Sequence, residues 1–188
     1  TGQFSQMEAN FSLFFGLAVQ AYERTLVADD TPVDKFLDGT GKLTAQQQLG
    51  MVMFQTKGKC LNCHGGAELT NASVQNVENQ RLERMVMGND VCGIYDDGFY
   101  NIGSRPTDDD IGVGGTDPFG DPLSETGMAL LGKFTETGLT PPLGDVPDCD
   151  TRQVVMGAFK TPGLRNAELT GPYTHAGHKA TLWQVVDF

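Results

Sequence analysis

Cys60-Leu61-Asn62-Cys63-His64 is the stretch that decides the fold of this chain. Two thiols three positions apart can each form a thioether bond to a vinyl group of one haem, and a histidine directly after them is held beneath the iron. This pattern is the attachment signature of a covalent c-type haem. It predicts one haem c fixed by Cys60 and Cys63, with the neutral imidazole of His64 as proximal ligand.

Two other chemistries use a Cys-x-x-Cys pair. A structural zinc site would need four sulfurs, which Cys92 and Cys149 could complete, but these two cysteines lack the paired spacing of zinc ligands. A thioredoxin-like redox pair would need a βαβ context, which the flanking sequence does not have. The sequence therefore favours covalent haem.

Composition narrows the class of partner. The chain has 188 residues, of which 39% are hydrophobic, enough for one well-buried core. Its formal net charge of −11 argues against a nucleic-acid partner, whose phosphates require a basic face, and against anionic lipid surfaces. The same acidity confers solubility and would also steer a basic redox partner, and both interpretations stay open.

The sequence contains no membrane-span signal, because its longest apolar run, Leu13 to Val19, is far shorter than the ~20 residues required. The opening Thr1-Gly2-Gln3 also lacks the basic start of a signal peptide. Because haem is attached covalently outside the bacterial cytoplasm, we expect a periplasmic or otherwise exported protein, in mature or truncated form. In that compartment Cys92 and Cys149 form either a disulfide or two free buried thiols, and the sequence does not decide which.

Four segments have helical patterns. Apolar residues recur every three or four positions from Met7 to Leu26, in a stripe wide enough to predict packing on two sides. The capping box Thr44-Ala45-Gln46-Gln47 starts a helix that leads into the haem motif. Residues 71–87 predict a helix of modest quality, and Thr181-Leu182-Trp183-Gln184 starts another near the end of the chain.

Between residues 88 and 150 periodicity fades, and Gly, Asp, Pro and Thr dominate. A loop of this length is uncommon in a compact domain and is usually functional or ordered by packing. Within it, Val91 to Ile102 predicts a hairpin around Asp96-Asp97-Gly98. The expected fold class is therefore mainly α, a cytochrome c-like haem domain with a long irregular Gly- and Asp-rich insertion.

Three further motifs accompany the haem motif: Gly98–Gly103, Phe159–Asn166 and Leu169–His175. Together with the attachment signature they closely resemble the bacterial di-haem cytochrome c peroxidase family, which includes the di-haem enzymes that mature methylamine dehydrogenase. The likeness covers most of the chain. It implies that this chain is similar to the C-terminal, electron-transferring haem domain of the family.

The resemblance implies roles for individual residues. His64 would be the proximal ligand of the C-terminal haem. Thr170 and Pro172 match positions whose backbone carbonyls bind a calcium ion between the two haem domains, with a side-chain ligand supplied by the other domain. His175 matches a histidine at the haem edge that faces the other haem. Arg165 would pair with a haem propionate, or else form turn and core-polar hydrogen bonds.

The chain also departs from the family pattern, since it has one Cys-x-x-Cys-His motif where the family has two. In the resemblance, the half without a counterpart here carries the haem that meets hydrogen peroxide, so we expect no catalytic residue in this chain. The sixth iron ligand of the family falls just after Phe188. Candidates within the chain are two histidines and four methionines: His175, His178, Met85, Met87, Met128 and Met156.

The expected function is electron transfer through haem c, as the C-terminal domain of a di-haem peroxidase-like oxidoreductase that reduces peroxide at a second haem outside this chain. The expected partners are that second haem domain, or another redox protein, and a small electron-donor protein. The alternative is a mono-haem electron carrier, or a haem-bearing subunit of a larger assembly, without catalysis of its own.

We expect one domain over residues 1–188. Within it we distinguish a packing helix and linker (1–42), a haem-attachment region (43–87), the loop-rich insertion (88–150), and a haem-pocket and interface segment (151–188).

Overall fold

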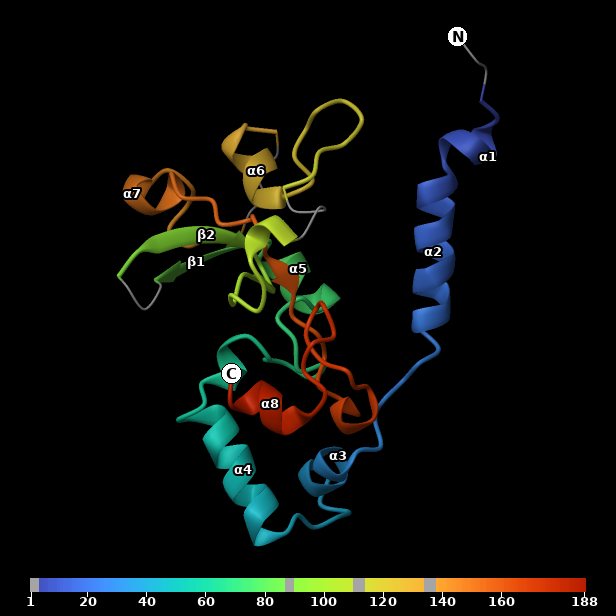
Figure 1. Cartoon of the computed structure of the whole chain (residues 1–188), viewed down its shortest axis with the longest axis vertical. Coiled ribbons are helices and arrows are strands. Elements are labelled where there is room, and N and C mark those ends of the chain that lie inside the picture. The colour runs from blue at the N-terminus through green and yellow to red at the C-terminus, as the bar shows by residue number, and fades with distance from the viewer. Residues whose placement is uncertain (1–3, 87–89, 110–113, 134–137) are drawn as a thin grey trace. The chain divides into compact units, whose positions relative to one another are not determined.

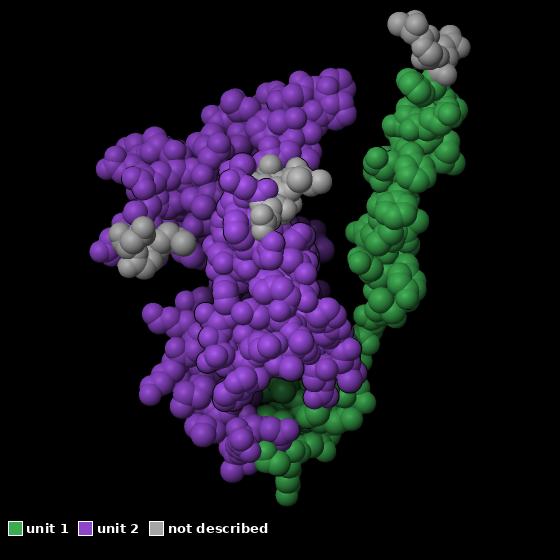
Figure 2. Space-filling model, in the orientation of Figure 1, with its two compact units in different colours: residues 1–44 green, residues 45–188 purple. Residues whose placement is uncertain are grey.

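The computed structural model describes residues 4–86, 90–109, 114–133 and 138–188. Figure 1 shows a mostly helical chain with little sheet, which confirms the expected mainly α class. The chain divides into two compact units, Thr1–Thr44 and Ala45–Phe188, which Figure 2 colours separately. This boundary lies close to the end of the predicted packing helix and linker, while the organisation as one haem domain stays a prediction.

The first unit contains α1 (Gln6–Ala9), α2 (Phe11–Glu23) and α3 (Pro32–Leu37). The predicted helix from Met7 to Leu26 is therefore present, with a break between α1 and α2. α3 was not predicted, although its start carries a clear signal. Thr31 and Asp34 form a reciprocal capping box and proline occupies the first helical turn, where its missing N–H is not needed.

The apolar stripe of α2 remains at the surface of its own unit. Among the described residues, no side chain of α1 or α2 is buried. Phe11 and Phe15, one helical turn apart, stack with ring centroids 6.0 Å from each other. The predicted packing on two sides is thus not provided by the first unit itself.

The second unit begins with α4 (Ala45–Gln55), which starts where the capping-box pattern placed it, and continues into the 3₁₀ turn η1 (Cys60–Asn62). The predicted helix over 71–87 is wrong in its second half. α5 spans only Val74–Asn79, and β1 (Leu82–Val86) follows it. The reason is tertiary, because β1 pairs antiparallel with β2 (Cys92–Asp96), and that pairing overrides a weak helical pattern.

The predicted hairpin over 91–102 is also wrong in its pairing. β2 pairs with β1, whereas β3 (Phe99–Tyr100) pairs with β4 (Phe159–Lys160) in a second two-stranded sheet. The turn at Asp97 and Gly98 therefore connects two sheets. Gly98 has φ +78°, and a Cβ there would lie 2.2 Å from the backbone nitrogen of Ala72, so only glycine allows the turn to approach that segment.

The insertion between 88 and 150 contributes to the core of the second unit. Its helices α6 (Glu125–Leu130) and α7 (Pro147–Asp150) both lie against β2. The buried cluster is made of apolar side chains from β1, β2, α6 and the segment before α7: Leu82, Ile94, Ala129 and Leu139, with Leu143 packed against them. Part of the predicted irregular insertion is thus ordered by packing.

One disulfide and one ion pair link α7 to the paired strands β1 and β2. The structure resolves the open question about the remaining cysteines, because Cys92 and Cys149 form a disulfide with Cα atoms 4.9 Å apart. Next to it, the Arg84 guanidinium contacts the Asp150 carboxylate at 2.7 Å, with the two side chains only 12% and 6% exposed. Arg84 also donates to the carbonyls of Pro141 and Pro142, so the charge is well satisfied.

The remaining elements are the 3₁₀ turns η2 (Thr107–Asp109) and η3 (Ala167–Leu169), and the last helix α8 (Leu182–Val186). Thr181 and Gln184 form the predicted capping box of α8. In the described part of the chain, none of the helices combines the length and apolar character needed to cross a membrane.

Candidate functional site

The attachment motif lies on a tight turn directly after α4. The chain leaves the helix through Gly58, whose N–H donates to the Met53 carbonyl at 2.8 Å, and through Lys59, which has φ 51°. A Cβ at Gly58 would lie 3.0 Å from the Cys60 sulfur and 3.0 Å from the Met53 oxygen. The His64 N–H donates to the Cys60 carbonyl at 2.9 Å, which closes the turn. One short turn therefore carries both thiols and the imidazole.

The ring of His64 is held in a defined orientation. Its Nδ1 lies 3.0 Å from the backbone carbonyl oxygen of Leu69. A carbonyl oxygen can only accept, so Nδ1 must carry the proton, and Nε2 is then the nitrogen with the lone pair. A hydrogen bond of this kind from the outer ring nitrogen typically fixes the tautomer and orientation of a metal-binding histidine.

The two motif cysteines are the free thiols among the described residues. Burial raises the pKa of the Cys63 thiol, and the neighbouring Glu83 and Cys60 raise it further. At neutral pH the sulfur therefore carries its proton. The donor set of two free thiols and an Nε2 lone pair, all on one turn, fits the covalent attachment and proximal ligation of a c-type haem.

Asn71 stabilises the attachment turn through hydrogen bonds to its backbone. Its backbone N–H donates to the Cys63 carbonyl at 2.9 Å, and its side chain donates to the Asn62 carbonyl at 2.6 Å. The Asn71 side-chain oxygen accepts from the Gly65 N–H at 3.1 Å. One asparagine thus holds backbone groups on both sides of Cys63 and His64. The sequence analysis did not identify this residue, because a single asparagine in a turn carries no distinctive signal.

The motifs that carried the family resemblance lie beside this turn. Pairing of β3 with β4 places Tyr100 opposite Phe159, and the Thr161 N–H donates to the Gly98 carbonyl at 2.8 Å. The Thr70 hydroxyl donates to the carbonyl of Thr161. Segments far apart in the sequence are therefore brought against the residues that follow His64.

Arg165 belongs to the same assembly. Its Nε donates to the Ala67 carbonyl at 2.9 Å, across 98 positions of sequence. This contact is of the turn-stabilising type that the sequence left open as one of two roles for Arg165. The pairing with a haem propionate stays a prediction.

The segment after η3 contains the remaining predicted site residues. His175 stacks on Phe159 of β4 with ring centroids 3.9 Å apart and planes 17° from parallel. Thr170 and Pro172 are exposed, and no group of three or more His, Cys, Asp or Glu side chains suited to a metal ion occurs within the described ranges. Calcium binding by their carbonyls stays a prediction that requires a ligand from another domain.

The candidate sixth ligands are spread over the chain. His178 is exposed and contacts the Thr174 hydroxyl at 2.9 Å through Nδ1. Met85 lies on β1 opposite Gly93, Met128 on α6, and Met156 is 53% exposed. Met87 lies outside the described residues. The positions of these side chains do not favour any one of them as the sixth iron ligand.

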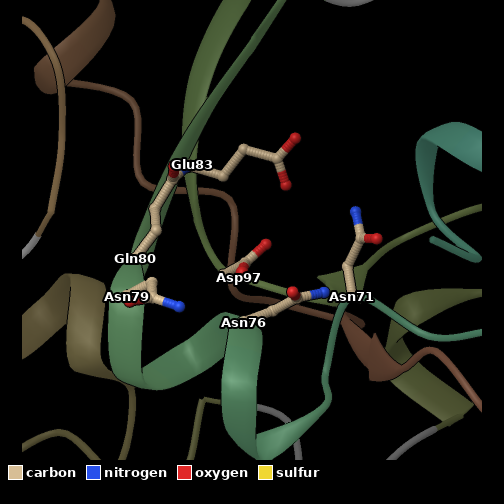
Figure 3. A pocket seen from close by; sticks show the side chains of 6 residues that line it. All are labelled: Asn71, Asn76, Asn79, Gln80, Glu83 and Asp97. Carbon is tan, nitrogen blue, oxygen red and sulfur yellow. The ribbon is translucent and has the colours of Figure 1, made fainter. Parts of the chain in front are cut away.

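A polar cluster next to the attachment turn was not predicted. Figure 3 shows Glu83 of β1 and Asp97, directly after β2, directed into a pocket of about 320 Å³. The pocket is lined otherwise by the amide side chains of Asn71, Asn76, Asn79 and Gln80. The Tyr100 hydroxyl donates to Glu83 Oε2 at 2.5 Å and accepts from Asn71 Nδ2 at 3.2 Å.

The cluster brings two carboxyl groups into one pocket (Figure 3). Burial, together with the Glu83 charge, raises the pKa of Asp97 to about 6. Burial, together with the bond to Glu83, also raises the pKa of Tyr100. This pair could not be recognised in the sequence, because Glu83 lies on β1 and Asp97 lies in the turn after β2.

Comparisons with known proteins show which proteins the chain resembles. No protein-family model matches it. It is 30% identical to the cytochrome-c peroxidase IdrP2 of Denitromonas iodatirespirans, an alignment that covers 99% of this chain and 42% of that protein. It is 29% identical to the cytochrome c peroxidase Ccp of Escherichia coli (strain K12), over 88% of this chain and 24% of that protein. It is 25% identical to the methylamine utilization protein MauG of Methylorubrum extorquens, over 90% of this chain and 32% of that protein.

The structural comparison agrees with the sequence comparison. The fold matches the crystal structure of a MauG-like protein associated with microbial copper homeostasis with a TM-score of 0.51 and 27% identity, over 90% of this chain and 37% of that one. The chain spans less than half the length of each of these relatives, in keeping with one domain of a larger family member. Over most of its length the chain is thus similar to bacterial cytochrome c peroxidases and to MauG proteins, in agreement with the resemblance of its sequence motifs.

Proposed function

We propose that this chain is a haem c electron-transfer domain, equivalent to the C-terminal haem domain of a di-haem cytochrome c peroxidase-like oxidoreductase. The observation that carries the proposal is the attachment turn, where two free thiols lie beside an imidazole whose Nδ1 is bonded to the Leu69 carbonyl. In covalent attachment each cysteine S–H adds across a haem vinyl group, so that a C–S bond forms and no atom is lost.

Each residue of the turn has a distinct part. Cys60 and Cys63 tether the cofactor, and the Nε2 lone pair of His64 is the proximal donor to iron. Asn71 and Gly58 keep the turn in a conformation where all three donors are available. Bound haem would supply an iron centre that accepts and releases single electrons.

The rest of the catalytic assembly belongs to the proposal as well. Peroxide would be reduced at a second haem that this segment does not carry, and electrons would arrive from a small cytochrome, as they do for peroxidases of this family. The net charge of −11 favours a basic donor protein. Thr170 and Pro172 would lie at the interface with the second haem domain, and the protein would act in the periplasm.

The test is production of the full-length protein in a bacterial host with haem-attachment machinery. Denaturing gels stained for haem and intact-mass measurement then report covalent attachment to this chain. We expect the Cys60→Ser/Cys63→Ser variant to lose that haem, and the matched Cys92→Ser/Cys149→Ser variant to retain it. Haem-free wild-type protein, or attachment that survives loss of Cys60 and Cys63, would refute the assignment.

Turnover separates the peroxidase proposal from the mono-haem alternative. The full-length protein should contain two haems per polypeptide and oxidise a reduced cytochrome when hydrogen peroxide is added. One haem per full-length polypeptide, with no peroxide-dependent oxidation of the donor, would favour a carrier or a non-catalytic subunit.

A further inference from the structure

The haem turn and the carboxyl pair are connected by a continuous set of hydrogen bonds. Asn71, which holds the turn at Asn62 and Gly65, also donates to the Tyr100 hydroxyl, and Tyr100 in turn donates to Glu83. The Asn71 amide donates to the Tyr100 hydroxyl and the Tyr100 hydroxyl donates to Glu83, so this series of hydrogen bonds ends at Glu83. The Glu83 carboxylate is therefore the acceptor at the end of the set.

Asp97 approaches the same acceptor from the other side. The Asp97 carboxyl lines the same pocket as Glu83 (Figure 3), and burial together with the Glu83 charge raises the pKa of Asp97, which favours Asp97 as the group that binds the proton. The Asp97 residue is only 8% exposed, whereas Glu83 is partly exposed. The two acids thus form a partly buried site that can take up one proton (Figure 3).

Among the charged groups near Asp97, Glu83 is the one whose charge acts most on the Asp97 carboxyl. Arg81, on the segment before β1, directs its guanidinium to Glu125 at 3.3 Å. The neighbouring Asp96 caps α6, accepting from the Thr126 N–H at 2.7 Å. These contacts point the nearby charges toward α6.

The other elements around the pair supply neutral groups or face away from it. Lys160 of β4 is exposed and lies opposite Phe99, one register position from the pair that includes Tyr100, so it lies on the other face of that ladder. α5 contributes the amides of Asn76 and Asn79 to the pocket. Tyr95, whose pKa is raised by burial and then by Glu83, is buried and stays neutral.

The pair is electrostatically connected to the haem position and has access to water. The Glu83 charge acts on the Cys63 thiol, one of the two proposed points of haem attachment. On the opposite side, the pocket that contains Glu83 and Asp97 is bordered by the exposed residues Asn79 and Gln80, which gives protons a polar route to solvent (Figure 3).

We propose that the Glu83–Asp97 carboxyl pair is a proton-binding site linked to the haem of this chain, so that one proton from solvent binds the pair when one electron enters the haem iron. The proposal rests on the proposed function, because it requires haem at Cys60 and Cys63. One electron comes from a one-electron donor protein and one proton from water, so the net charge of the domain is unchanged. Release of the electron releases the proton.

The linkage has a definite sign. An added electron makes the surroundings more negative and raises the proton affinity of the pair, and by reciprocity a bound proton raises the affinity of the haem for the electron. The midpoint potential therefore falls as the pH rises through the titration of the pair. A tenfold difference in proton affinity between the reduced and the oxidised protein corresponds to a fall of ~59 mV for one electron.

The experiment is spectroelectrochemical titration of the haem of this chain in the full-length protein, between about pH 5 and about pH 8. Haem content is measured first, so that failure of the proposed function is seen separately as absence of covalent haem. We expect the wild-type potential to fall with pH, the Asp97→Asn potential to be flatter over the same range, and the exposed-site control Asp148→Asn to follow the wild type. Haem propionates affect all three proteins alike.

A second variant covers failure of Asp97→Asn to fold. In Glu83→Gln the like charge beside Asp97 is gone, so the pH-dependent part of the curve should move to lower pH while the Tyr100 bond to position 83 is kept. Identical pH dependence in the haem-loaded wild type and in whichever of the two variants folds would overturn the proposal. Redox-induced infrared difference spectra give an independent readout, since protonated-carboxyl signals must appear on reduction of the wild type and be absent in Asp97→Asn.

Discussion

Replacement of Asn71 by alanine should loosen the haem turn more than any other single polar substitution in its neighbourhood. The side chain makes three hydrogen bonds, to the carbonyl of Asn62, the N–H of Gly65 and the hydroxyl of Tyr100. At about 1 kcal/mol net for each, the loss is about 3 kcal/mol. For a unit the size of residues 45–188 this lowers Tm by about 10 °C.

The assay is thermal unfolding followed by circular dichroism on the purified full-length protein, with urea titration to obtain the free energy of unfolding. The matched control is Asn79→Ala, because the Asn79 side chain is exposed and donates to the Gln75 carbonyl of its own helix. We expect that control to change stability by about 0.5 kcal/mol or less.

A double-mutant cycle localises the effect. Asn71→Ala and Tyr100→Phe remove the two ends of one hydrogen bond, so their combined cost should be smaller than the sum by about 1 kcal/mol. The reasoning is refuted if Asn71→Ala melts within about 2 °C of the wild type, since three satisfied hydrogen bonds cannot then be contributing as calculated.

Three further results are expected. Gly98→Ala should lower the free energy of unfolding by about 3 kcal/mol in a urea titration, because its Cβ would lie 2.2 Å from a backbone nitrogen. Gly103 is also at positive φ but has open space around it, so Gly103→Ala should cost about 1 kcal/mol. Equal losses in the two variants would contradict the close approach at Gly98. Arg84→Met should destabilise by about 3–5 kcal/mol, because it leaves the Asp150 carboxylate buried without its partner, and a loss below about 1 kcal/mol would show that the pair is not buried in solution. The pKa of Asp97 is raised from an ordinary 3.8 to about 6, so the folded state binds more protons than the unfolded state between these values. The contribution of Asp97 to stability is therefore full below about pH 4 and is lost as the pH rises through about 6. An Asp97→Asn variant whose stability changes with pH as steeply as that of the wild type would argue against this assignment.

The sequence determined the local features of this protein because each depends on a few adjacent residues. Cys60 to His64 form a single turn whose chemistry is set by their spacing. The capping-box patterns at Thr44 and Thr181 mark helix starts, because such a pattern needs only four consecutive residues. The family resemblance was available for the same reason, since it consists of short uninterrupted motifs.

Only the tertiary structure decided what depends on long-range pairing. The weak helical pattern over 71–87 ends before Leu82 because β1 pairs with β2, which begins ten residues later. β3 pairs with β4 and not with β2 after the turn at Gly98. The Cys92–Cys149 disulfide needed two segments 57 positions apart to meet.

The candidate site divides in the same way. The two thiols that would tether the haem and the imidazole that would bind its iron lie within five consecutive residues, so they could be identified from the sequence. Its supporting groups lie on separate strands and turns, so only folding could bring Asn71, Tyr100, Glu83 and Asp97 together. The pKa of Asp97 follows from burial and from one neighbouring charge, and neither exists until the chain is folded.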